Sequence, residues 1–142
     1  MSTKTNSRID AANAIQHLQH FMPRAQLMNL GAYCFGEEGQ FFIDKLVEFG
    51  NRVETMPKTY AQDGKGNQAV AYLHYFFGGM DWYITERDID TDGAGQIQAF
   101  GLADLGYGAE LGYISIPEII DVGAELDLYF EPTTIENLCS TG

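Results

Sequence analysis

The spacing at which apolar residues recur along this 142-residue chain changes once, between residues 57 and 70. Before that stretch, apolar residues recur at helical spacing, most clearly over residues 40–54, where Phe42, Leu46 and Phe49 share one face. After it, short runs rich in β-branched and aromatic residues alternate with Gly and Asp clusters, which is typical of strands joined by turns. Helices that precede strands, rather than alternate with them, predict an α+β fold.

The same patterns predict the positions of the elements. Helices are expected at residues 9–22, where Pro23 ends the pattern, at 25–30 and at 40–54. An antiparallel sheet of four to five strands is expected over about residues 70–130, packed against the N-terminal helices, with strand runs at 70–77, 82–88, 96–103, 110–116 and 126–130. Residues 1–142 are predicted to form a single domain, with a helical part at about 9–56 and a β-rich part at about 68–138.

The charge of the chain is unevenly distributed. It carries 20 acidic and 8 basic residues, a net charge of −12, and no Lys or Arg follows Arg87. Direct binding to nucleic acid is disfavoured, because affinity for phosphates comes from Lys and Arg. One surface is predicted to be strongly negative, and it is either a solvated face that maintains solubility or a binding face for a basic protein.

The sequence shows no signal for export or membrane insertion. Residues 1–8 are polar, and no apolar run reaches the length of a signal peptide or of a membrane span. Cys34 and Cys139 are far apart and have no metal-ligating neighbours, so two reduced thiols are expected. These features predict a soluble, cytoplasmic protein without a membrane partner.

Residues 88–93 match the first half of a calcium-binding loop. Asp88, Asp90 and Asp92 alternate ahead of Gly93, but the twelfth position holds Ala99 where such loops require a bidentate Glu. A solvated acidic turn is the main interpretation, and weak divalent-cation binding is the alternative. The sequence otherwise predicts no metal and no cofactor.

Aromatic residues in the β-rich part are too numerous for one sheet face, because successive strand residues point to opposite sides. Some are expected to line the solvent side or a groove, and an aromatic groove with acidic edges would suit a protein or peptide ligand with basic residues. The alternative is that these aromatics form the packing surface for the N-terminal helices. The candidate binding residues are Trp82, Tyr83, Tyr113, Glu118, Asp121 and Glu125.

Two strand carboxylates and a histidine form a candidate catalytic set. Glu86 and Glu110 belong to strands of one predicted sheet, and paired carboxylates act as general acid and base where burial separates their pKa values. No nucleophile accompanies the pair. The main interpretation is therefore that the chain has no catalytic site, and a small hydrolase that uses Glu86, Glu110 and His74 is the alternative.

Two segments, Asp81–Glu86 and Ala109–Ser115, resemble the bacterial domain-of-unknown-function family number 2958. Residues 98–101 and 126–132 are similar to that family as well, so the resemblance covers about residues 68–138. Members of this family occur mostly on plasmids, integrative elements and phages. The resemblance therefore implies a mobile-element setting, and it supplies no catalytic residues.

Charge, aromatic content and resemblance together favour a non-enzymatic accessory protein of a mobile genetic element. It is expected to bind a basic host or element-encoded protein through its acidic, aromatic β-rich surface. A sharper form of this hypothesis is a DNA mimic that acts against host defence. The sequence leaves the identity of the partner and the oligomeric state open.

Overall fold

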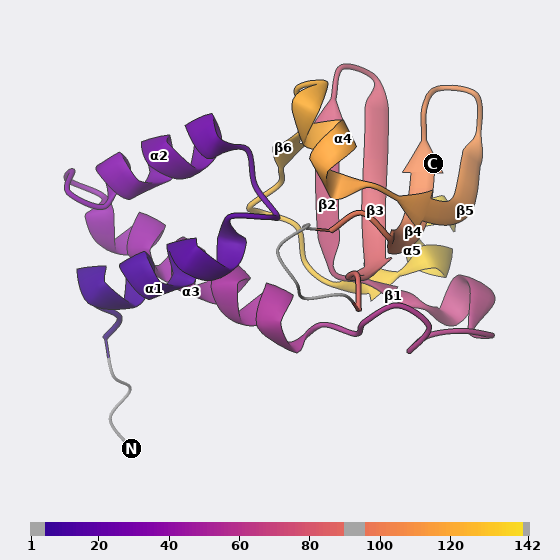
Figure 1. The fold of residues 1–142 in the computed structure, drawn as a ribbon, viewed down its shortest axis with the longest axis horizontal. Coiled ribbons are helices and arrows are strands. Elements are labelled where there is room, and N and C mark those ends of the chain that lie inside the picture. Colours follow the sequence, from indigo (N-terminus) through magenta and orange to yellow (C-terminus); the bar gives the residue numbers. More distant parts are fainter. Residues whose placement is uncertain (1–4, 90–95, 141–142) are drawn as a thin grey trace. The chain divides into compact units, whose positions relative to one another are not determined.

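The computed structural model describes residues 5–89 and 96–140, and it contains helices and antiparallel strands (Figure 1). The chain divides into two compact units, a helical unit of residues Met1–Thr55 and a β-rich unit of residues Met56–Gly142. The predicted α+β class is confirmed. The predicted single domain, and the predicted packing of the helices against the sheet, stay predictions.

Three helices make up the helical unit: α1 (Arg8–Leu18), α2 (Arg24–Tyr33) and α3 (Gly39–Thr55). Ser7 caps α1, because its Oγ accepts the amide N–H of Asp10 while the Asp10 carboxylate accepts the amide N–H of Ser7. Pro23 lies directly before α2. The proline thus separates α2 from α1, as the sequence predicts, and helix α1 ends some residues earlier than the periodicity suggests.

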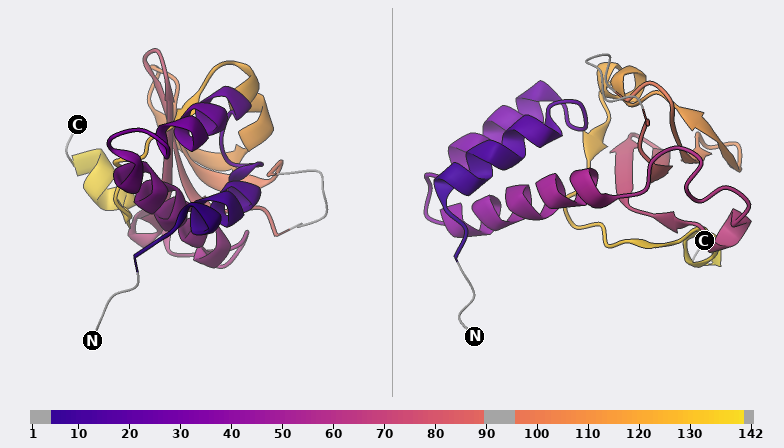
Figure 2. Two further views of the ribbon diagram at one scale, coloured as in Figure 1. Left: turned by 90° about the vertical axis from the view of Figure 1, so that its left-hand side faces the viewer. Right: turned by 60° about the horizontal axis from the view of Figure 1, so that its bottom comes forward.

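Helices α1 and α3 lie side by side in both views of Figure 2. At Gly50 of α3 an added Cβ would lie 2.8 Å from the Cβ of Ala14 in α1. Such a distance is shorter than a van der Waals contact between carbon atoms. The lack of a side chain at Gly50 therefore permits this helix pair.

The main sheet of the β-rich unit has five antiparallel strands in the order β5-β4-β3-β2-β6. Their bounds are β2 (Leu73–Phe77), β3 (Met80–Glu86), β4 (Ala99–Asp104), β5 (Ala109–Ile114) and β6 (Glu125–Leu126), and helix α4 (Ile116–Asp121) follows β5. Strand β6 is much shorter than the predicted run at 126–130, because Asp127 accepts the amide N–H of Tyr129 at 2.9 Å and turns the chain away.

A second, two-stranded sheet joins the two ends of the β-rich unit. It pairs β1 (Val70–Ala71) with β7 (Thr133–Thr134), and it is flanked by the 3₁₀ helix η1 (Gly66–Gln68) and by helix α5 (Ile135–Ser140). The sequence predicts neither β7 nor α5. Strands of two residues are too short to show an alternating pattern.

The register of the main sheet defines its two sides, since residues opposite each other on antiparallel strands point the same way. One row across the sheet consists of His74, Tyr83, Leu102 and Leu111, and this side is called the His74 face. The neighbouring row, on the other side, consists of Tyr75, Trp82, Ala103 and Glu110, and this side is called the Tyr75 face. A small apolar core that includes Leu102 and Ile135 of α5 covers part of the His74 face.

Both cysteines are free thiols, with Cys34 buried and Cys139 exposed. Burial raises the pKa of the Cys34 thiol, against an opposing effect of the Arg8 charge, and its Sγ donates to the Leu30 carbonyl at 3.3 Å.

Among the residues that the structure describes, no helix has both the length and the apolar content to span a bilayer.

Buried tyrosines predict a loss of stability in alkali. Tyr75 is fully buried, and desolvation raises its pKa well above the usual value; desolvation, followed by the charges of Asp81, Asp104 and Asp127, also raises the pKa of Tyr83. The folded state therefore holds these protons more tightly than the unfolded chain, whose tyrosines titrate near pH ~10. Their contribution to stability is complete below about pH 10 and is lost as the pH rises through the folded-state values.

The measurement is the free energy of unfolding in urea as a function of pH. We expect it to fall between about pH 9 and pH 11, and to fall less in the Tyr75→Phe variant, which has no phenol to ionise. Tyr107→Phe is the matched control, because Tyr107 is 96% exposed and should leave the pH dependence as it is. If Tyr75→Phe and Tyr107→Phe showed the same pH dependence, ionisation of groups other than Tyr75 would cause the loss of stability at high pH.

Candidate binding pocket

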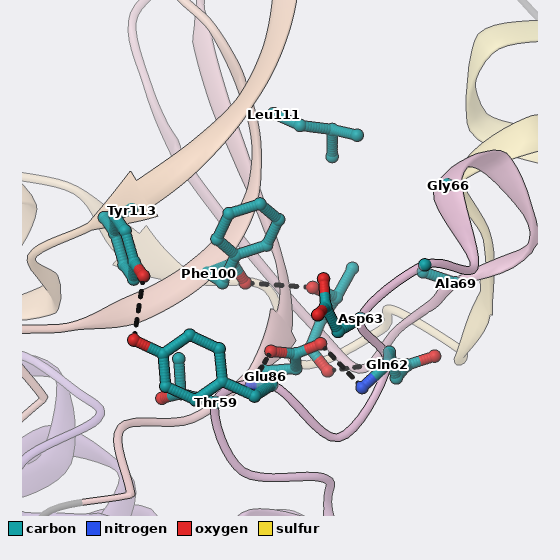
Figure 3. Close-up of a pocket in the computed structure, with 12 residues that line it drawn as sticks. Thr59, Gln62, Asp63, Gly66, Ala69, Glu86, Phe100, Leu111 and Tyr113 are labelled. Carbon is teal, nitrogen blue, oxygen red and sulfur yellow. Dashed lines mark hydrogen bonds between the residues drawn. The ribbon is translucent and has the colours of Figure 1, made fainter.

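A cleft of ≈ 410 Å³ opens on the His74 face of the β-rich unit, where β3 ends beside the loop that precedes β1 (Figure 3). It is called the pocket below. Binding sites for small ligands have volumes of about 300–1,000 Å³, so the pocket has the size to hold one side chain or a small molecule. Its lining residues are Thr59, Tyr60, Gln62, Asp63, Gly64, Gly66, Ala69, Thr85, Glu86, Phe100, Leu111 and Tyr113.

An irregularity in the pairing of β3 with β4 aims Glu86 at the pocket. Ile84 pairs with Gly101, but Glu86, two residues further, pairs with Phe100, so Thr85 is the extra residue of a β-bulge. The Thr85 hydroxyl donates to the Phe100 carbonyl at 3.1 Å, which holds the bulge closed. Glu86 consequently points to the same side of the sheet as Phe100, which is the side of the pocket.

The Glu86 carboxylate is buried and receives two backbone hydrogen bonds. Its Oε1 accepts the amide N–H of Tyr60 at 2.6 Å, and its Oε2 accepts the amide N–H of Gln62 at 2.9 Å (Figure 3). Glu86 is only 4% exposed, and within the described part of the chain no Lys, Arg or His forms a salt bridge with it. A carboxylate has about four lone-pair positions, so about two remain for a ligand.

Gln62 anchors the same loop through its side chain. Its Nε2 donates to the carbonyls of Val70 at 2.9 Å and Thr85 at 2.8 Å, and its Oε1 accepts the amide N–H of Val70 at 2.7 Å. Nearby, the amide of Thr59 donates to the Arg87 carbonyl at 2.7 Å. The loop over the pocket is thus fixed to β1 and to the end of β3 by these polar contacts.

Tyr60 has the one positive φ, +79°, among the non-glycine residues described. This left-handed conformation costs about 1–2 kcal/mol for a residue with a side chain. The hydrogen bond from its amide to buried Glu86 compensates for that cost. The result is a tyrosine ring held at the mouth of the pocket, 61% exposed, with its hydroxyl 3.0 Å from that of Tyr113.

Aromatic rings form the walls of the pocket. Phe100 and Tyr113 meet edge to face with ring centroids 5.6 Å apart and an interplanar angle of 89°. The hydrogen bond with Tyr60 is the largest of several causes that raise the pKa of Tyr113, and the carboxylates of Asp63 and Glu86 act in the same direction. Asp63 and Glu86 line the pocket together with Tyr113, and the lining contains no Lys, Arg or His.

The three residues of the candidate catalytic set do not share a site. Glu86 lines the pocket, whereas Glu110 lies on β5 next to Leu111 and points to the Tyr75 face. His74 pairs with Tyr83, three residues before Glu86 on β3. The hydrolase alternative stays a prediction, although Glu86, Glu110 and His74 do not line one common pocket.

His74 lies between two carboxylates. Its Nδ1 is 2.9 Å from Asp127 Oδ2, its Nε2 is 2.7 Å from Asp81 Oδ1, and its ring stacks on Tyr83 with centroids 4.5 Å apart. An imidazole with a proton on each nitrogen donates to both carboxylates, whereas a neutral ring donates to only one. His74 thus links β2, β3 and the segment after β6.

The predicted binding residues occupy different parts of the β-rich unit. Trp82 is buried on the Tyr75 face, Tyr83 is half-buried beneath His74, and only Tyr113 lines the pocket. The other three are all exposed and lie on or near α4 and β6; they are called the α4 patch, which consists of Glu118, Asp121 and Glu125. Because β5 and β6 are the two edges of the sheet, Tyr113 and Glu125 lie at opposite ends of it.

The candidate calcium loop falls largely outside the described residues, which do not include Asp90 and Asp92. Asp88 is described and is buried, and its Oδ2 accepts the amide N–H of Gln98 at 2.9 Å. No cluster of three or more metal-ligating side chains is found within residues 5–89 and 96–140. The alternative of weak divalent-cation binding stays a prediction.

Sequence reasoning did not identify the loop residues Tyr60, Gln62 and Asp63 as part of a site. Their partners lie more than twenty residues away, as with the separation of 26 between Tyr60 and Glu86. No local pattern of residues marks such a contact. Glu86 and Tyr113 were identified, because they lie in runs rich in β-branched and aromatic residues, which predict strands of one sheet.

Comparison with known proteins agrees with the resemblance seen in the sequence. Searches of the curated proteins and of the solved structures returned no match. The sequence model of the family described as "Protein of unknown function (DUF2958)" matches residues 45–135, a segment that contains every residue lining the pocket. The match covers well over half of the chain, and the chain therefore belongs to this family.

Proposed function

We propose that the β-rich unit is a non-enzymatic binding module that recognises a basic partner protein. The observation that carries this proposal is the pocket, where exposed aromatic rings and two carboxylates lie beside the exposed edge strand β5. Aromatic residues are enriched in the cores of protein interfaces, and exposed strand edges accept extended segments of other chains. Carboxylates at such an edge favour a partner with Lys and Arg.

The charge of the β-rich unit supports a basic partner. This unit contains fourteen acidic residues against three basic ones, Lys58, Lys65 and Arg87, and Arg87 is buried. A field of one sign raises the rate at which an oppositely charged protein is encountered. The α4 patch, at the other edge of the sheet, would act through this long-range field, and the pocket would make the close contacts.

The mobile-element setting and the DNA-mimic hypothesis are finer forms of the same proposal. If the mobile-element setting is right, the partner is a protein encoded by the host or by the element. The second requires that duplex DNA compete with the chain for its partner, because a mimic occupies the surface that phosphates otherwise contact. A competition titration with a short duplex separates a mimic from other acidic binding proteins.

The proposal is tested by reversing charge on the α4 patch. The double variant Asp121→Lys/Glu125→Lys leaves Glu118 in place, since a carboxylate in the first turn of α4 stabilises that helix. For a partner captured by the parent protein, we expect the association rate of this variant to fall about tenfold at low salt, with a weaker salt dependence and little change in the dissociation rate. The measurement is surface plasmon resonance at several salt concentrations.

Glu37→Lys/Glu38→Lys provides the matched control. Both of these residues are exposed in the helical unit, so the control changes the net charge by the same amount in the other unit. We expect its effect on the association rate to be clearly smaller. Equal rates for the parent and the α4-patch variant at low salt would contradict the proposal and assign the charge to solubility.

A further inference from the structure

We propose that the pocket holds the guanidinium group of an arginine, carried by an extended segment of the partner that adds as a strand to the outer edge of β5. This inference rests on the proposed function and names the chemistry by which the partner is recognised.

The first argument is the incomplete pairing of Glu86. A carboxylate that is 4% exposed is costly to bury unless hydrogen bonds and an opposite charge compensate. The amides of Tyr60 and Gln62 supply two hydrogen bonds, and the described residues supply no cation. Asp63 adds a second carboxylate to the same lining. The pocket is therefore built for a group that brings positive charge and N–H donors.

The second argument is the aromatic wall. Tyr60, Phe100 and Tyr113 line the space around the two carboxylates, as Figure 3 shows for the labelled rings. A cation over an aromatic face gains about 0.5–2 kcal/mol, more when water is excluded. A guanidinium is planar, stacks on rings and is less strongly hydrated than an ammonium group, so it loses less on entering a buried site. It also offers paired donors to a carboxylate, which a lysine does not.

The third argument is the geometry of β5. Among the described residues, β5 pairs only with β4, so its outer backbone edge is available. Leu111 and Tyr113 alternate along β5 with their side chains toward the pocket. A strand that paired with this edge would place every second side chain on the same side, so one of them would lie over the pocket. An arginine at that position reaches Glu86 along its long stem.

The probe is a short, blocked peptide of alternating Val and Thr with one central Arg, titrated into the full-length protein. Amide chemical shifts in ¹⁵N-labelled protein give both the affinity and the location of binding. We expect shifts at Tyr60, Gln62 and the β5 amides, and about tenfold weaker binding for the same peptide with Gln at the centre. A central Lys should give an affinity between the two.

The variant Tyr60→Gly tests the pocket without weakening the fold. Glycine adopts a positive φ freely, so this substitution relieves the backbone strain and removes the ring together with its exposed hydrogen bond to Tyr113. We expect unchanged or higher thermal stability together with at least about fivefold weaker binding of the Arg peptide. Asp63→Asn, at an exposed position, should also weaken the Arg peptide but leave the Gln peptide unchanged.

Tyr107→Ala and Glu37→Gln are the matched controls, because Tyr107 is 96% exposed in the β4–β5 turn and Glu37 is an exposed carboxylate of the helical unit. Both should bind the Arg peptide as the parent does. The inference is overturned if the Arg and Gln peptides bind equally, if the Lys peptide binds as tightly as the Arg peptide, or if Tyr60→Gly binds like the parent. These measurements need no natural partner. A failed titration therefore overturns the pocket assignment alone, whereas a partner insensitive to charge reversal overturns the proposed function.

Discussion

Replacing Gly101 by alanine is expected to destabilise the β-rich unit by roughly 3 kcal/mol or more. A Cβ at this position would lie 1.9 Å from the carbonyl oxygen of Tyr83, an atom of the neighbouring strand that cannot move without breaking the β3–β4 pairing. The same pairing positions the bulge that aims Glu86 at the pocket. We expect a lower urea midpoint and, at room temperature, a partly unfolded population in the circular dichroism spectrum.

Gly112→Ala is the control for this experiment. Gly112 lies directly opposite Gly101 in the β4–β5 pairing, yet a Cβ there would meet no atom within 4 Å. Its replacement should change the free energy of unfolding by no more than about 0.5–1 kcal/mol, which is the ordinary range for a glycine in a strand. Similar losses in both variants would show that β3 and β4 separate more easily than their register implies.

Glu86→Ala should release the loop over the pocket. The substitution leaves the amides of Tyr60 and Gln62 without acceptors, and each unsatisfied buried amide costs about 1–3 kcal/mol. We expect a total loss of about 2–4 kcal/mol, reduced where water reaches the freed groups. Limited trypsin digestion reports the loop directly, because Lys58 and Lys65 lie in this segment and should be cut much faster in the variant.

Glu110→Ala is the corresponding control. This carboxylate is exposed on β5 and its removal should change stability by no more than about 0.5 kcal/mol, with trypsin cleavage unchanged. If Glu86→Ala were as stable and as resistant to trypsin as Glu110→Ala, the backbone hydrogen bonds to Glu86 would contribute nothing measurable to stability or to holding the loop in place. Such a result would leave Gln62 as the main anchor of the loop.

Much of the fold could be predicted because its signals are local. Helix α3 follows a regular helical pattern over its whole length, and β3 and β5 coincide closely with predicted runs. Two-residue strands such as β7 leave no pattern to detect. Their pairing depends on residues far apart in the chain, as in the alignment of Val70 with Thr134.

The candidate site was less predictable, and the β-bulge shows why. Strict alternation along β3 would put Glu86 on the same side as Trp82 and Ile84, which face away from the pocket. The extra residue Thr85 reverses that direction. A bulge is set by the pairing with β4 and by the Thr85 hydroxyl, so the sequence of β3 alone does not reveal which side Glu86 takes.

The anchoring of the loop to Glu86 also sets an order of assembly. Strands β2 and β3 form a hairpin of neighbouring residues, whereas the loop before β1 needs the finished end of β3 before its amides find their acceptors. Contacts between near neighbours in sequence form first, because the entropy lost in closing a chain loop grows with its length. The loop should therefore close after the β2–β3 hairpin during folding and open before it from the native state. In native-state hydrogen exchange, the amides of Tyr60 and Gln62 would exchange through this partial opening, ahead of the amides at the centre of β3.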